Sequence, residues 1–288
     1  MTEAVEIVEV GPRDGLQNEP RVIPAAEKVA LIDLLSGAGF RRIEAASFVS
    51  PRWVPQMADG AEVMAAIARA PGVRYAALAP NPRGLERALA AGIDEIAIFV
   101  SASEGFSRAN LNATIDESFE RLSPVAAGAL SAGASLRGYV SCVTDCPFDG
   151  RVAPADVARV ADRLIALGCG EVSLGDTIGR GVPESVDAML GAVLAVTDPG
   201  RLAGHFHDTG GQALANVEVA LARGLRVFDG AVGGLGGCPY APGAAGNVAT
   251  EALARRLEAL GYGTGLDLAV LDRAAQMARA MRGGPPAA

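Results

Sequence analysis

The 288-residue sequence predicts a closed (β/α)8 barrel, the TIM-barrel fold class. Short β-rich runs alternate with Ala- and Leu-rich stretches of helical periodicity along the chain. Eight such strand–helix units in about 250 residues match the size of a closed parallel barrel. Several helical stretches end in small, Gly-containing segments such as "LLSGAGF" and "ALGCG", which are typical of a helix end that leads into the next strand. An open doubly wound sheet is the alternative.

The expected strands are spaced along the whole sequence. The first four cover residues 5–10, 41–47, 73–79 and 95–101. The last four cover residues 136–143, 171–176, 202–207 and 227–234. Prolines near helix starts fit the first turn, where a missing N–H loses no hydrogen bond, and they stand at positions 24, 55, 82, 124, 154 and 183. Because no linker divides the chain, we expect residues 1–288 to form one barrel domain with a short disordered C-terminal tail.

Composition and charge exclude several classes of partner. The formal net charge is −8 and the pI is near 4.9, so we expect no nucleic-acid partner, because phosphate binding needs clustered Lys and Arg. No apolar run approaches the roughly 20 residues of a membrane span, and the N-terminus enters a strand pattern with no signal segment. Four cysteines are too few for a disulfide scaffold in a chain of this length. These features predict a cytoplasmic protein with reduced thiols.

Both histidines of the chain fall in one segment, "GHFHDTGG", which begins at Gly204. Alternate residues of a strand point to the same face, so His205 and His207 are expected to share a task. The alternative is a structural role for both as hydrogen-bonded polar residues inside a strand.

Other polar residues stand near the C-terminal ends of the expected strands, which is where the catalytic residues of such barrels lie. They come from "GPRDG" after the first strand, from the second and sixth strands, and from the glycine-rich loop after the eighth strand. These residues are Arg13, Asp14, Glu44, Asp176, Cys238 and Asn247. The structural alternatives are a turn pair for Arg13 and Asp14, a charge partner for Glu44, and a helix cap for Asp176.

The combination of side chains indicates metal chemistry. Two neutral imidazoles with a carboxylate and an amide oxygen suit a divalent ion such as Mg²⁺, Mn²⁺ or Co²⁺. A structural zinc site would commonly use thiolates, and we interpret Cys142 and Cys146 as ordinary buried thiols. The only lysine, Lys28, stands where the first helix begins, so it is not placed to form a Schiff base inside the barrel. Carbon–carbon bond chemistry would therefore have to use the metal.

Six long motifs cover nearly the whole chain: "EVGPRDGLQNEP", "IEAASFVSPRWVPQMAD", "RGYVSCVTDCPFDGRV", "SLGDTIGRGVP", "GHFHDTGGQALANV" and "GGLGGCPYAPGAAGN". Together they resemble the 3-hydroxy-3-methylglutaryl-CoA (HMG-CoA) lyase family of the metal-dependent pyruvate-carboxylase-like barrel superfamily. The resemblance implies a divalent cation, Mg²⁺ or Mn²⁺, with four ligands: Asp14, His205, His207 and Asn247. It also implies that Arg13 polarises the thioester carbonyl, that Cys238 is the thiol of a lid, and that two acidic residues give support: Glu44 and Asp176.

The implied reaction is cleavage of HMG-CoA to acetyl-CoA and acetoacetate, with His205, Asp176 or both removing the hydroxyl proton and Cys238 protonating the enolate carbon. The resemblance further implies a CoA-thioester substrate, a homodimer and a place in leucine or related catabolism. A Claisen-type synthase of the same superfamily, acting on acetyl-CoA and a 2-oxo acid, or a lyase for a related 3-hydroxyacyl-CoA, is the first alternative. Such synthases usually have a Glu–Arg pair where this chain has "GGCPYA", which favours the lyase. A non-catalytic barrel that serves as a binding module is the second alternative.

Overall fold

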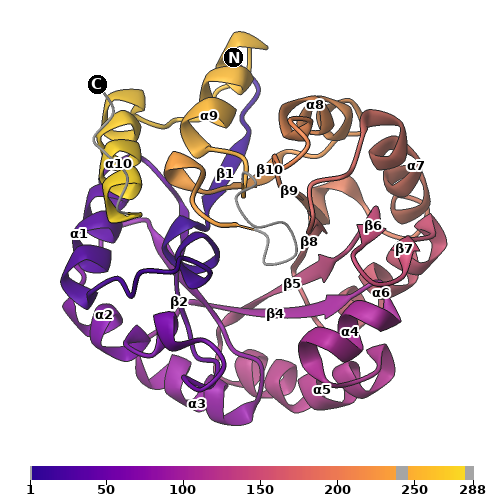
Figure 1. Cartoon of the computed structure of the whole chain (residues 1–288), viewed down its shortest axis with the longest axis horizontal. Coiled ribbons are helices and arrows are strands. Elements are labelled where there is room, and N and C mark those ends of the chain that lie inside the picture. The colour runs from indigo at the N-terminus through magenta and orange to yellow at the C-terminus, as the bar shows by residue number, and fades with distance from the viewer. Residues whose placement is uncertain (1, 238–245, 283–288) are drawn as a thin grey trace.

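The computed structural model describes residues 2–237 and 246–282. Eight strands make up its barrel: β1 (Glu6–Glu9), β2 (Arg42–Ser47), β3 (Arg74–Leu78), β4 (Glu95–Ser101), β5 (Ser135–Ser141), β8 (Glu171–Asp176), β9 (Leu202–Phe206) and β10 (Val227–Gly230). The barrel is closed in the order β1-β10-β9-β8-β5-β4-β3-β2, with neighbouring strands parallel (Figure 1). The predicted fold class is confirmed, and the open sheet is excluded.

Helices surround the barrel (Figure 1). They are α1 (Ala25–Ser36), α2 (Gly60–Ala66), α3 (Pro82–Ala90), α4 (Glu104–Leu111), α5 (Ile115–Ser131), α6 (Pro154–Ala166), α7 (Pro183–Val193), α8 (Ala213–Ala222), α9 (Thr250–Ala259) and α10 (Leu268–Met281). Proline begins α3, α6 and α7, as predicted. The prediction was wrong for Pro124, which lies inside α5. That helix begins earlier, where Thr114 and Glu117 form a reciprocal capping box.

The eighth barrel strand is shorter than the predicted range 227–234. It ends at Gly230, and Val232–Gly234 form a short 3-10 turn, η4. Gly233 and Gly234 have φ angles of +68° and +63°, a left-handed backbone that cannot continue a strand. The sequence pattern also missed a small antiparallel hairpin after β5, made of β6 (Asp145–Cys146) and β7 (Gly150–Arg151).

The main apolar core is built from residues of the barrel strands and the helices. Charged side chains at or near the N-terminal ends of several strands form an ion-pair network. Arg42 contacts Glu6 at 2.8 Å and Glu171 at 2.9 Å. Arg137 contacts Glu171 at 2.7 Å and Asp229 at 2.7 Å. Each of these side chains is thus paired with an opposite charge, which offsets the cost of removing the charge from water. The network links β1, β2, β5, β8 and β10 beneath the rim.

A second, small apolar cluster lies higher in the barrel, on strands β3 to β5. It contains Leu78, Ala97 and Tyr139, with Val49 and Phe99 packed against it. Among the residues that the structure describes, no helix is long and apolar enough to cross a membrane.

Candidate active site

The segment that follows β1 places two predicted site residues on the C-terminal rim of the barrel. Residues Gly11–Gly15 form η1, a single turn of π-helix. The backbone N–H groups of Arg13, Asp14 and Gly15 all donate to the carbonyl of Val10, at 3.2, 2.8 and 3.2 Å. This turn ends the strand and fixes the backbone from which Arg13 and Asp14 project.

Both glycines of "GPRDG" are required by close packing. A Cβ atom on Gly11 would lie 2.5 Å from Oε1 of Glu9, and one on Gly15 would lie 2.6 Å from Cβ of Leu235. Neither distance is tolerated between real atoms, so a larger residue would displace the turn or, at Gly11, the carboxylate of Glu9. The two glycines of the motif therefore serve close packing, and Arg13 and Asp14 between them are the candidates for chemistry.

Arg13 is held by two carboxylates. Its Nη1 lies 2.6 Å from Oδ1 of Asp14, and its Nη2 lies 2.6 Å from Oε2 of Glu44. Burial alone would lower the pKa of Arg13, but the charges of Glu44 and Asp14 outweigh this effect and raise the pKa above its ordinary value. The Nε atom is buried and has no hydrogen-bond partner among the described residues. Arg13 is thus a fixed, permanent cation with donor capacity to spare.

Glu44 receives a second hydrogen bond, from the hydroxyl of Tyr139 to Oε2 at 3.1 Å. Two guanidinium groups contact the Tyr139 ring, with the Cζ atoms of Arg13 and Arg137 at 5.5 and 4.9 Å from its centroid. Burial raises the pKa of Glu44, and the charge of Arg13 opposes this rise. These contacts give Glu44 the task of orienting Arg13.

Asp14 and the two histidines form a cluster of potential metal ligands. One ligand atom from each of Asp14, His205 and His207 lies within 4.8 Å of the other two. Asn247 donates from Nδ2 to Oδ2 of Asp14 at 2.8 Å, so the fourth predicted ligand borders the cluster. Burial would raise the pKa of Asp14, but the charge of Arg13 and the two imidazoles lower it to about 2. Asp14 is therefore ionised at neutral pH.

The histidine pair occupies the end of β9. His205 lies in the strand, and His207, one residue past it, pairs through its backbone with Asn247. The two rings are 5.3 Å apart between centroids, so the structure brings the pair together as the alternation predicted. Burial and the neighbouring His205 lower the pKa of His207 to about 4. Its buried Nδ1 has no partner among the described residues, and a neutral imidazole with an unpaired nitrogen suits a cation.

Asp176 is near the rim but is engaged elsewhere. Its Oδ1 accepts from the hydroxyl of Thr144 at 3.0 Å and from the Arg180 N–H at 3.3 Å, and its Oδ2 accepts from the Gly181 N–H at 2.8 Å. The preceding Gly175 faces His205, since a Cβ there would lie 3.7 Å from its Cδ2, so Asp176 points to the other side of β8. This placement fits a carboxylate that organises the loop after β8. Such a role is similar to the helix cap that was the structural alternative for Asp176.

The structure also places the cysteines and the lysine. Cys238 lies outside the described residues. Cys142, Cys146 and Cys169 are free and buried, which agrees with their interpretation as ordinary thiols. Lys28 lies on α1 and contacts Asp59 at 2.7 Å. The expectation that this lysine is absent from the barrel interior is confirmed.

Sequence reasoning missed three buried residues that support the site: Asp229, Arg137 and Tyr139. Asp229 lies 3.0 Å from Nδ1 of His205. All three alternate along β5 or β10 with residues that face the helices, so they point into the barrel. A charged or phenolic residue at an inward position of an apolar strand was the available signal.

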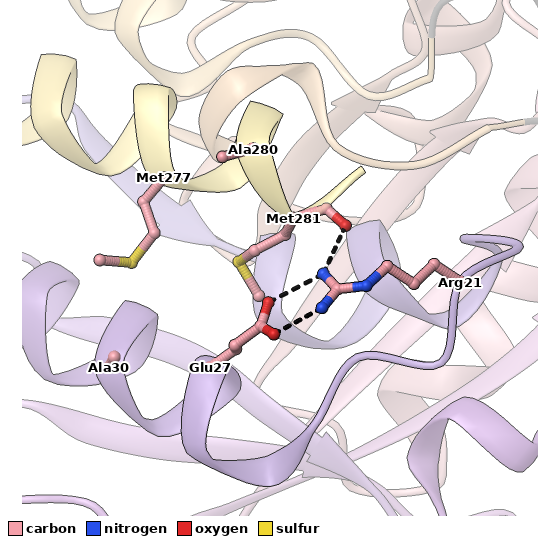
Figure 2. A pocket seen from close by; sticks show the side chains of 6 residues that line it. All are labelled: Arg21, Glu27, Ala30, Met277, Ala280 and Met281. Atoms are coloured by element: carbon pink, nitrogen blue, oxygen red, sulfur yellow. Dashed lines mark hydrogen bonds and ion pairs between the residues drawn. The ribbon is translucent and has the colours of Figure 1, made fainter. Parts of the chain in front are cut away.

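A pocket on the outside of the barrel lies between α1 and α10 and is separate from this site (Figure 2). Arg21 closes one side, pairing with Glu27 at 2.6 Å and donating to the Met281 carbonyl at 3.0 Å. None of the candidate site residues lines this pocket. Its lining consists of Arg21, Glu27, Ala30, Met277, Ala280 and Met281.

Comparison with known proteins gives a decisive match. The family described as HMGL-like matches residues 4–278. The chain belongs to the HMGL-like family. A protein of Pseudomonas mevalonii named hydroxymethylglutaryl-CoA lyase is 56% identical over 266 residues, which are 92% of this chain and 88% of that protein. The resemblance inferred from the motifs is thereby confirmed.

Two further relatives extend the comparison. The crystal structure of the HMG-CoA lyase from Brucella melitensis has a TM-score of 0.97 at 61% identity, with 98% of this chain and 100% of that chain covered. A Pseudomonas aeruginosa protein named 3-hydroxy-3-isohexenylglutaryl-CoA/hydroxy-methylglutaryl-CoA lyase is 53% identical, with 98% of this chain and 94% of that protein covered. Lyases therefore match this chain over nearly its full length.

Proposed function

We propose that this protein cleaves HMG-CoA to acetyl-CoA and acetoacetate with the help of a divalent cation. One observation carries the proposal: the ligand cluster of Asp14, His205 and His207 adjoins the buried pair of Arg13 and Glu44 in a chain of the HMGL-like family. A cation at this cluster would bind the hydroxyl of such a substrate, and the fixed guanidinium of Arg13 would donate hydrogen bonds to the thioester oxygen.

The residues present fit a divalent cation. Asp14 is ionised, His207 is neutral, and the buried Nδ1 of His207 lacks a partner among the described residues. We propose Mg²⁺ or Mn²⁺, held by Asp14, His205, His207 and Asn247, because mixed oxygen and imidazole ligands suit these ions. Bound there, the cation would lower the pKa of the substrate hydroxyl and orient the bond that breaks.

Arg13 is assigned to the thioester carbonyl, on whose oxygen negative charge grows as the enolate of acetyl-CoA leaves. Glu44 and Asp14 hold the guanidinium from two sides, so it needs no reorganisation during the reaction. The hydroxyl proton is assigned to Nε2 of His205 rather than to Asp176, since His205 lies in the cluster and Asp176 is bound to the loop after β8. Because Nδ1 of His205 faces Asp229, this one nitrogen would either hold the cation or accept the proton, and not both at once. Cys238 is assigned to protonate the enolate carbon.

Asp176→Asn tests the assignment of that residue to the loop. An amide in place of one carboxylate oxygen turns a donor toward Thr144 or toward a backbone N–H, so we expect a loss of about 1–3 kcal/mol in the free energy of unfolding. We expect Mg²⁺ affinity to change little, because Asp176 points away from His205. Urea denaturation and calorimetric Mg²⁺ titration measure the two quantities. A kcat loss above about 100-fold at unchanged stability would instead make Asp176 the base.

Cys238 is expected to be the one fast-reacting thiol, because Cys142, Cys146 and Cys169 are buried and burial raises the pKa of Cys169 to about 12. One equivalent of maleimide should react with Cys238 and inactivate the enzyme. A substrate analogue bound together with Mg²⁺ should prevent this reaction. Cys238→Ser should lower kcat by about 10²–10⁴-fold without unfolding the protein, because a hydroxyl is a poorer proton donor. Wild-type turnover of that variant, or labelling at Cys146, would refute the assignment.

Product analysis separates the lyase from its alternatives. The protein loaded with Mg²⁺ should form acetoacetate and acetyl-CoA from HMG-CoA. A synthase would instead release CoA from acetyl-CoA and one member of a 2-oxo acid panel, and a binding module would do neither. Because one relative's name includes an isohexenyl substrate, the same assay should include 3-hydroxy-3-isohexenylglutaryl-CoA.

Three finer expectations belong to the same proposal: a cytoplasmic location, a homodimer, and a place in leucine or related branched-chain catabolism. Size-exclusion chromatography with light scattering tests the homodimer directly, with a monomer as the contradicting result.

A further inference from the structure

Asp229 approaches His205 from below the rim. It lies on β10 with a fully buried side chain, and its Oδ2 is 3.0 Å from Nδ1 of His205. The contact occupies one imidazole nitrogen and leaves Nε2 on the side of Asp14, whose Oδ2 is 3.9 Å away.

Two other side chains keep Asp229 an acceptor. Arg137 donates to Oδ1 at 2.7 Å and to Oδ2 at 3.3 Å, and the Ser173 hydroxyl donates to Oδ2 at 2.8 Å. A carboxylate that is ion-paired with a buried guanidinium carries no proton of its own. The hydrogen bond between Asp229 and His205 therefore needs the proton on Nδ1, which leaves the lone pair of a neutral His205 on Nε2.

We propose that Asp229 is a positioning residue, which fixes His205 in its Nδ1–H tautomer and aims the Nε2 lone pair at the cluster of Asp14 and His207. A carboxylate behind a ligating imidazole both orients the ring and makes it a better ligand. The consequence for cation binding rests on the proposed function. The tautomer itself does not, because it is set by Asp229, Arg137 and Ser173 in the absence of a cation.

The same geometry predicts what Asp229→Asn does. Arg137 presents only donors, so the amide oxygen of the new side chain takes the position of Oδ1, nearest the guanidinium. Its NH₂ group then takes the position of Oδ2 and donates to Nδ1 of His205. The proton of the imidazole moves to Nε2, where it blocks the lone pair that faced the cluster.

The chain offers a simple spectrum for the test, since it has only two histidines. Protein labelled with ¹⁵N-histidine is recorded by long-range ¹H–¹⁵N NMR without metal, at about pH 9 and at higher pH until the His205 signals report a single ring proton. His207→Gln assigns the two rings. We expect Nδ1–H for His205 in the wild type and Nε2–H in Asp229→Asn.

Glu171→Gln is the matched control. Glu171 also pairs with Arg137, at 2.7 Å, but its other partner is Arg42 rather than His205. A merely structural role of the Arg137 network would make the two variants behave alike. We expect Glu171→Gln to keep the Nδ1–H tautomer and the wild-type affinity for Mn²⁺, and Asp229→Asn to lose about 10–100-fold in that affinity, measured by EPR titration.

A neutral His205 with its single proton on Nε2 in the metal-free wild type would overturn the proposal even if Asp229→Asn failed to fold. An unchanged tautomer in a folded Asp229→Asn, or equal Mn²⁺ losses in the two variants, would also overturn it. Absence of HMG-CoA cleavage with the expected tautomers in place would refute the proposed function alone.

Discussion

Arg13→Met is expected to lower kcat for HMG-CoA cleavage by about 10²–10⁴-fold. Methionine keeps the length of the side chain and removes the donors and the charge assigned to the thioester oxygen. Arg13→Lys should recover little activity, because an ammonium cannot span Glu44 and Asp14 as the planar guanidinium does. Steady-state kinetics with saturating Mg²⁺ measures the effect.

Cation affinity is the control for this prediction. Arg13 lies 2.6 Å from Asp14, so its removal takes a positive charge away from the cation site. Arg13→Met should therefore bind Mg²⁺ as tightly as the wild type or more tightly. Loss of Mg²⁺ binding together with activity would show that Arg13 acts by holding the site in shape.

Removal of the cation is the second change with a large expected effect. EDTA should abolish cleavage, and added Mg²⁺ or Mn²⁺ should restore it, because lowering the pKa of the substrate hydroxyl is assigned to the cation. His207→Ala should weaken cation binding by at least about tenfold, since it removes one ligand of the cluster. Full activity in the presence of chelator would contradict the assignment, as would His207→Ala with wild-type affinity.

The barrel was predictable because its signals are local and repeated. Alternating strands and helices give the fold class, and residues at strand ends then converge on one rim without any knowledge of side-chain packing. Arg13, Asp14, Glu44 and the histidine pair meet in the structure for this reason.

The supporting residues could not be found in the same way. The contact of Asp229 with His205 depends on the register of β10 against β9, which pairs Phe228 with Gly204, and that register is not written in any local motif. Asp176 shows the opposite problem. Its position at a strand end is the same as that of a catalytic residue, and only the direction of its side chain, toward Gly181, distinguishes a loop anchor from a base.

Crystals soaked in Mn²⁺ test the central claim most directly, with diffraction data collected at the manganese absorption edge. The account predicts one anomalous peak per chain at the cluster, in contact with the carboxylate of Asp14 and the imidazoles of His205 and His207. A peak bound elsewhere, or no peak at this cluster in crystals that still cleave HMG-CoA, would contradict it.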